Sequence, residues 1–189
     1  KGEYVYNEKF LQDEITKLGT DGTVLIDKHS GTERTITDAA LKSLLAVLAE
    51  IEDHSRQLAL KGLTFEEYLE MRNDDDLLPL YRLSVGEEQL YCYSNQELTD
   101  RVQVFKKVHA QNEDGKAVEE EVTFQPEILE FTERAAVEAS LRELKEQSFD
   151  PAYLSDLARE QVDPFILRDN KEEVVLTTLS AIPDQIREF

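Results

Sequence analysis

Residues 37–61 decide the fold, and their sequence is TDAALKSLLAVLAEIEDHSRQLALK. Thr37 can cap the start of a helix, with Asp38 in the first turn, where the helix dipole favours an acid. A second apolar pair, Leu58 and Leu60, comes just before Gly62, which is a natural helix stop. The pattern therefore predicts one core helix, roughly 35 Å long at 1.5 Å per residue. Its apolar face is formed by residues at three- and four-residue spacing: Ala40, Leu41, Leu44, Leu45, Leu48 and Ile51.

Shorter patterns on both sides of this helix predict an α+β fold. We expect it to be mainly helical, with a few short antiparallel hairpins packed on the long central helix. Capping boxes at Thr64 and Ser94, each with a glutamate three residues later, predict the starts of two further helices. Apolar alternation around turn-forming residues predicts hairpins at 24–36, 81–93 and 165–176. The other expected elements are a strand at 4–6, a helix at 7–18, a helix at 126–147, a short helix at 148–157 and a terminal helix from 180.

One segment is typical of a linker. Residues 111–121 (QNEDGKAVEEE) are polar, strongly acidic and contain Gly115. We therefore expect a strand–helix and long-helix–hairpin half at 1–110, an acidic linker at 111–121, and a helical segment with a hairpin and C-terminal helix at 122–189. At 189 residues, these parts are expected to form one compact domain.

The net charge limits the partners of this chain. With 21 basic and 41 acidic residues, the formal charge is −20. Proteins that bind DNA neutralise phosphates with lysine and arginine, and the only basic pair of note is Lys106-Lys107. We therefore expect the chain to repel a bare duplex. No apolar run approaches the length of a membrane span, and the single cysteine, Cys92, fits a reducing cytoplasm. We expect a cytoplasmic protein without a membrane partner.

The residues that could support catalysis or bind metal do not form a convincing site. Asp74, Asp75 and Asp76 suggest a calcium loop, but the sixth and twelfth positions counted from Asp74 are Pro79 and Val85 instead of glycine and glutamate. A solvated turn is the better interpretation. We predict no catalytic, cofactor-binding or metal-binding residue in this chain.

The remaining candidates are isolated in the sequence. His29, His54 and His109 have no metal-ligand spacing, and each is interpreted as a surface or boundary histidine. Cys92 lies in a predicted strand without a basic neighbour, which favours a small buried residue over a nucleophile. Phosphate-binding loops, dinucleotide motifs and nucleophile elbows are absent from the sequence.

Three stretches, in order, resemble one family. Residues 1–10 (KGEYVYNEKF) look like the GKKxYY(V/I)xxDEEM tail of the metal-binding TOPRIM domain in the B subunits of DNA gyrase. Residues 62–82, 86–88 and 90–98 resemble the insert that some bacterial gyrase B chains carry within that domain. Residues 176–189 (LTTLSAIPDQIREF) are similar to the helix that runs into the family's KGLGEM motif. The chain begins with Lys1 and ends inside a predicted helix, so we expect a fragment excised from a longer protein.

The resemblance implies an accessory insert of an ATP-dependent type IIA topoisomerase, which modulates supercoiling or strand passage. ATP and magnesium are implied for the parent protein, and none of its catalytic motifs is present here. The implied partners are the rest of the gyrase B subunit and the gyrase A subunit, with DNA reached only through the parent complex. Two alternatives stay open: a stand-alone acidic protein-interaction domain, and a DNA mimic with its acids clustered on one elongated face. An enzyme in its own right is the weakest interpretation.

Overall fold

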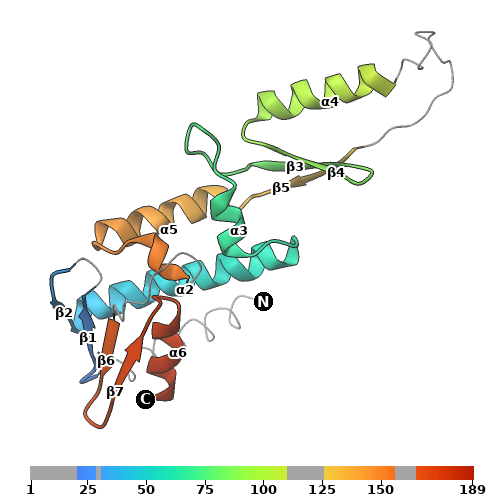
Figure 1. Cartoon of the computed structure of the whole chain (residues 1–189). Helices are drawn as coiled ribbons and strands as arrows, with labels where there is room; N and C mark the ends of the chain where they lie inside the picture. Colours follow the sequence, from blue (N-terminus) through green and yellow to red (C-terminus); the bar gives the residue numbers. More distant parts are fainter. Residues whose placement is uncertain (1–20, 29–30, 110–125, 156–164) are drawn as a thin grey trace, which may run out of the picture. The chain divides into compact units, whose positions relative to one another are not determined.

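The computed structural model describes residues 21–28, 31–109, 126–155 and 165–189 (Figure 1). The predicted strand at 4–6, helix at 7–18 and linker at 111–121 lie outside these ranges. The architecture is α+β, as predicted. Its elements are β1 (Val24–Asp27), β2 (Arg34–Ile36), α2 (Asp38–Leu60), α3 (Phe65–Glu70), β3 (Tyr81–Val85), β4 (Glu88–Cys92), α4 (Asn95–His109), β5 (Glu127–Glu130), α5 (Arg134–Glu146), the 3₁₀ helix η1 (Pro151–Leu154), β6 (Phe165–Arg168), β7 (Glu173–Leu176) and α6 (Ala181–Glu188).

The chain divides into two compact units. Unit 1 comprises residues 1–56 and 137–189, and unit 2 comprises residues 57–136. The boundary therefore falls within α2 and within α5. Unit 2 is a continuous segment inserted into unit 1, so both ends of the chain belong to unit 1.

The bounds of the long helix α2, Asp38–Leu60, confirm the extent of the predicted helix at 37–61. Five of the six residues assigned to its apolar face are buried, and Ala40 is the exception because it lies exposed in the first turn. Of the apolar pair before Gly62, Leu58 is buried and Leu60 is 89% exposed. Gly62 ends the helix with φ +82°, while Leu63 N donates to Leu58 O and Gly62 N to Ala59 O. This is a Schellman motif, which needs a left-handed residue at the position of Gly62.

Unit 1 contains a four-stranded antiparallel sheet in the order β2-β1-β6-β7. The two predicted hairpins, β1–β2 and β6–β7, are both present and are joined through the β1–β6 pair, in which Leu25 lies opposite Leu167. One face of the sheet is closed by fully buried apolar side chains, including Leu25, Phe165 and Leu167. Burial of a side chain of this size contributes about 1.5–3 kcal/mol.

The helices of unit 1 are held to each other by side-chain and main-chain bonds. Leu179 N donates to Tyr153 O, and Ser180 Oγ donates to Leu154 O, which ties the start of α6 to η1. Tyr153 packs edge-on against Phe165 with ring centroids 5.8 Å apart. The short helix expected at 148–157 is a single 3₁₀ turn here, capped by Asp150.

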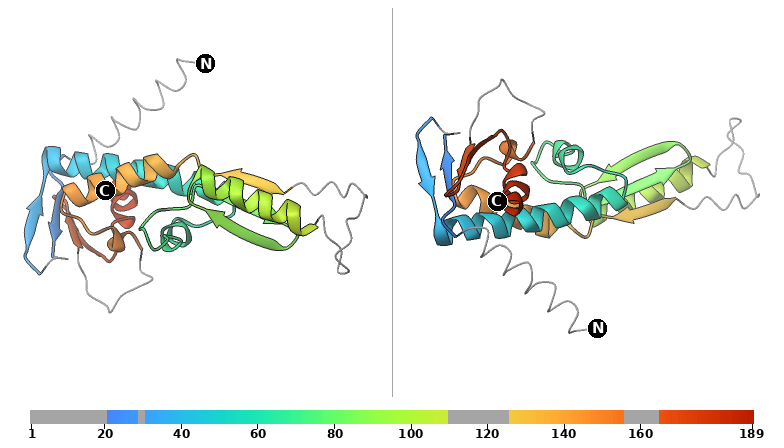
Figure 2. Two further views of the ribbon diagram at one scale, coloured as in Figure 1. Left: turned by 90° about the horizontal axis from the view of Figure 1, so that it is seen from above. Right: turned by 90° about the horizontal axis from the view of Figure 1, so that it is seen from below.

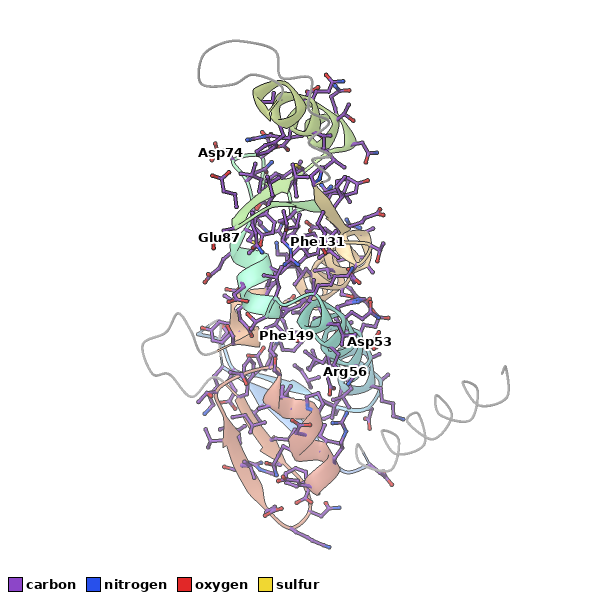
Figure 3. The ribbon with its side chains drawn as sticks, turned by 90° about the vertical axis from the view of Figure 1, so that its right-hand side faces the viewer. Asp53, Arg56, Asp74, Glu87, Phe131 and Phe149 are labelled. Carbon is purple, nitrogen blue, oxygen red and sulfur yellow. The ribbon has the colours of Figure 1, made fainter. Side chains whose placement is uncertain are left out.

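Unit 2 is built around a three-stranded antiparallel sheet in the order β4-β3-β5. Figure 2 shows α4 along one face of this sheet. Leu83 and Cys92 are buried on the sheet, and the ring of Tyr68 from α3 packs on Phe131 at 5.1 Å. Phe131 points into the interior of the unit (Figure 3).

Both predicted capping boxes position helices of unit 2. Thr64 Oγ1 accepts a hydrogen bond from Glu67 N, and the Glu67 carboxylate accepts one from Thr64 N, which is the reciprocal pattern of a capping box. At α4, Ser94 Oγ accepts a hydrogen bond from Glu97 N, as in a capping box. The Glu97 carboxylate accepts from Tyr93 N, whereas a standard capping box would use the main-chain N–H of Ser94.

The predicted helix at 126–147 was partly wrong. Residues Glu127–Glu130 form strand β5, and the helix begins only at Arg134. Leu129 lies opposite Arg82, and Ile128 lies opposite Leu83 of β3. The strand forms because a distant segment offers a ladder of hydrogen bonds, which overrides the local helical preference.

Candidate functional site: ion pairs, histidine and acidic turn

The strongest polar cluster of unit 1 is centred on Arg34 in β2. Its Nε donates to Asp27 Oδ2 at 2.6 Å, and the side chain of Asp27 is fully buried. The two terminal nitrogens donate to Gln147 O and Ser148 O, both at 3.0 Å. The guanidinium also stacks over the ring of Phe149, 4.3 Å from its centroid. Arg34 therefore neutralises a buried carboxylate and satisfies the carbonyls that the end of α5 leaves unpaired.

The end of α5 has an unusual residue in its cap. Phe149 N donates to Leu144 O and Ser148 N to Lys145 O, which is again a Schellman motif. The left-handed position is taken by Ser148, with φ +64°, where glycine is the usual residue. Arg34 contacts the carbonyl of this same residue, so the cluster supports a strained turn.

The corresponding cluster of unit 2 is centred on Lys61. Its ammonium donates to both carboxylate oxygens of Glu133, at 2.9 and 2.7 Å, and to Glu130 O at 2.9 Å. Burial by itself would raise the pKa of Glu133, but the hydrogen bonds from Lys61 and the main chain outweigh it, so the pKa lies below its ordinary value. The pair connects the end of α2 to the turn between β5 and α5.

Arg82 adds a second cation to the cluster around Lys61. Its Nη1 donates to Lys61 O at 3.0 Å, at the carboxyl end of α2. Its Nε is the one buried side-chain polar atom without a hydrogen-bond partner in the part of the chain that the structure describes. A cation at this helix end is favourable for the helix dipole. Arg82 therefore satisfies a main-chain carbonyl at the carboxyl end of α2.

His54 is the one predicted histidine whose side chain the structure describes. Ser140 Oγ lies 3.1 Å from Glu50 Oε2 and 3.4 Å from His54 Nε2. A serine, a histidine and a carboxylate suggest nucleophilic catalysis, but here the serine hydroxyl contacts both other groups and is 2% exposed. The trio therefore braces α2 against α5 within unit 1. His29 and the side chain of His109 lie outside the described residues.

The three aspartates after α3 lie in a solvated turn, as predicted. Asn73 Oδ1 accepts from Asp75 N and Leu77 N, and Arg72 Nη1 donates to Asp76 O at 2.7 Å. All three carboxylates are exposed, and Figure 3 shows Asp74 at the surface. Across the described ranges, no three histidine, cysteine or acidic side chains are grouped to hold a metal ion.

Cys92 is buried in β4, as predicted. Burial raises the pKa of its thiol above the ordinary value, and the nearby Glu97 carboxylate raises it further. Because the thiolate is the reactive form, this cysteine is a core residue and a poor nucleophile. The side chains of Lys106 and Lys107 lie outside the described residues.

The clusters that the sequence did not reveal are pairings between side chains of different helices, strands and turns. Arg34 with Asp27 and Phe149, Lys61 with Glu133, and Ser140 with His54 hold each unit together. One weak signal could have pointed to Asp27, because it follows the apolar run Val24-Leu25-Ile26 directly in the sequence. None of the described helices is both long and apolar enough to cross a membrane.

Comparison with known proteins gives a partial relationship. A stretch of 97 residues, half of this chain, is 31% identical to the B subunit of DNA gyrase from Chlamydia pneumoniae. The match covers 12% of the length of that protein. No family model matches the chain. No solved structure matches it either. Half of the chain is therefore related in sequence to a gyrase B subunit.

Proposed function

We propose that this chain is an accessory insert of the B subunit of a type IIA DNA topoisomerase. The observation that carries the proposal is the similarity to a gyrase B subunit over 97 residues. The order of the three sequence stretches that resemble the same family supports it. The described residues add paired ions and packed cores, which suit a structural part of a larger enzyme.

The charge favours an indirect role toward DNA. At −20, the chain repels the phosphate backbone, which carries one negative charge per ~1.7 Å of duplex. An anionic block beside a DNA path would confine the duplex, or would bind basic surfaces of its own enzyme. The insert would thereby tune communication between the ATPase gate and the DNA gate. ATP and magnesium would be handled elsewhere in the B subunit, and the A subunit would be the second protein partner in the cytoplasm.

A deletion in the complete B subunit tests the role. Residues 21–176 would be replaced by a short flexible linker, and the enzyme would be reconstituted with the A subunit. Basal ATP hydrolysis is expected to be retained, whereas supercoiling and the stimulation of hydrolysis by DNA are expected to fall. A deletion enzyme that supercoils at the rate of the intact enzyme, with normal DNA stimulation, would refute the accessory role.

A gel shift tests the expected repulsion of DNA. The isolated chain should leave a linear duplex unretarded at physiological salt up to micromolar protein, because it lacks the cations that replace condensed counterions. Retention that weakens steeply with added salt would show a basic patch and would overturn the indirect role.

A further inference from the structure

The sheet of unit 2 ends in strand β5, which is paired on one side only. The strand order is β4-β3-β5, and among the described strands β5 pairs with β3 alone (Figure 1). Phe131 N donates to Leu80 O at 2.8 Å, and these two residues continue the register of the β3–β5 ladder. Hydrogen-bonded pairs alternate along an antiparallel ladder. The main-chain groups of Leu129 therefore point to β3, and those of Ile128 and Glu130 point away from the sheet.

The outer side of β5 is open to solvent. Ile128 is 48% exposed, and Glu127 and Glu130 are exposed as well. Within the described ranges neither of these two carboxylates forms an ion pair. Lys61 Nζ donates to Glu130 O at 2.9 Å, so this one carbonyl of the edge is already satisfied. The N–H and C=O of Ile128 and the N–H of Glu130 remain available for a partner.

The charge of this edge decides which strands can pair with it. Edge strands usually carry charged side chains, lysine above all, which discourage the addition of another strand. On β5 the charges are the two exposed glutamates, and an exposed isoleucine lies between them. Opposite charges across a strand pair are favourable and like charges are unfavourable. The edge therefore excludes acidic strands and favours a basic strand with an apolar residue at its centre.

We infer that β5 binds an extended basic segment of a partner protein, which adds to the unit 2 sheet as a further strand. Lysine or arginine would lie opposite Glu127 and Glu130, and an apolar side chain opposite Ile128. In this mode of recognition, main-chain hydrogen bonds supply affinity and the side-chain pairs supply specificity. The inference goes beyond the accessory role and does not depend on it, because binding needs only the folded unit 2.

Other copies and other parts of this chain are poor occupants of the edge. If two copies paired through β5, Glu127 of one strand would lie near Glu130 of the other, and the like charges would repel. Residues 111–121 are strongly acidic and would meet the same repulsion. Charge complementarity therefore points to a basic segment from outside this chain.

Two labelled peptides test the inference on the complete chain by fluorescence anisotropy. One peptide has the core KVVK, which in antiparallel register places its lysines opposite Glu127 and Glu130. The matched peptide has the core VKKV, with the same composition and charge but with its lysines opposite Ile128 and Leu129. The KVVK peptide is expected to bind about tenfold more tightly, because it gains two opposite-charge pairs. Equal affinities would show only the general attraction of cations to a chain of charge −20 and would overturn the inference.

A pair of proline variants identifies the edge that binds. Ile128→Pro removes an N–H that points away from the sheet and leaves the ladder to β3 in place, since proline is tolerated at such edge positions. Gln89→Pro is the matched change on β4. Ser84 lies opposite both Gln89 and Glu127 and bonds toward β5, so the Gln89 N–H also points outward. Ile128→Pro should abolish the preference for KVVK and Gln89→Pro should preserve it; any other pattern would overturn the inference.

Amide hydrogen exchange measured by NMR on the unmodified chain keeps the test decisive if a proline variant does not fold. Saturating KVVK peptide should slow exchange of the Ile128 amide by about tenfold, because the amide becomes hydrogen-bonded, and should leave the Gln89 amide unchanged. No protection at Ile128, or protection at Gln89 alone, would refute binding at β5. Protection of Ile128 that grows with protein concentration without peptide would show a second copy at this edge and would equally refute it.

Discussion

Replacing Arg34 with methionine is expected to destabilise unit 1 by about 3 kcal/mol, the lower end of the usual cost of breaking a buried ion pair. The lower end applies because Arg34 is 33% exposed, whereas the side chain of Asp27 is fully buried. Methionine keeps the aliphatic stem but removes the cation beside Asp27, the stacking on Phe149 and two bonds to carbonyls at the end of α5. Most of the cost is the buried carboxylate that has lost its cation.

Arg168→Met is the matched control. Arg168 lies in the same sheet and pairs with Glu173, but both side chains are about half exposed, at 52% and 46%. Exposed pairs contribute about 0–1 kcal/mol, so this variant should unfold almost as the parent does.

Native-state hydrogen exchange is the appropriate assay, because the chain has two units and need not unfold in one step. Peptides from β1 and α5 report on unit 1, and peptides from β3 report on unit 2. Asp27→Asn combined with Arg34→Met should cost less than the sum of the single changes, since the double variant buries no unpaired charge. If Arg34→Met is no more costly than Arg168→Met, or if the two changes add, the buried pair is not what stabilises unit 1.

Three further predictions follow from the caps, the Lys61 pair and the buried thiol. Ser148→Gly should stabilise unit 1 by about 0.5–1 kcal/mol in urea unfolding, because glycine adopts the left-handed conformation freely; a loss of stability would contradict the strained turn. The lowered pKa of Glu133 should make unit 2 less stable as the pH falls. The Glu133 contribution is complete above its unfolded-state pKa of about 4.3 and is lost as the pH falls through the lower folded-state pKa. Lys61→Met should flatten this pH dependence, and an unchanged slope would show that another carboxylate is responsible. Cys92 should react with a thiol reagent only after unfolding, because it is buried and its thiol pKa is raised; rapid modification of the native chain would argue against a closed core around β4.

Local patterns predicted local structure well. Leucine spacing and the glycine stop gave the extent of α2, and the capping boxes gave the starts of α3 and α4. The hairpins around β1–β2, β3–β4 and β6–β7 followed from alternation and turn residues. These features are determined by bonds between residues a few positions apart, so the information lies within a short window of sequence.

The tertiary structure decided what distant segments do to each other. The union of two hairpins into one sheet through β1 and β6, and the conversion of residues 127–130 from helix to strand, both depend on a partner far along the chain. The same holds for Arg34 with Phe149 and for Lys61 with Glu133. A charged residue in an apolar strand indicates that it needs a partner. The sequence does not say which residue that partner is, because the two segments meet only in the folded structure. The sequence by itself determined the long helix, the hairpin turns and the −20 charge, while the packing of the folded units decided the ion pairs and the strand at 127–130.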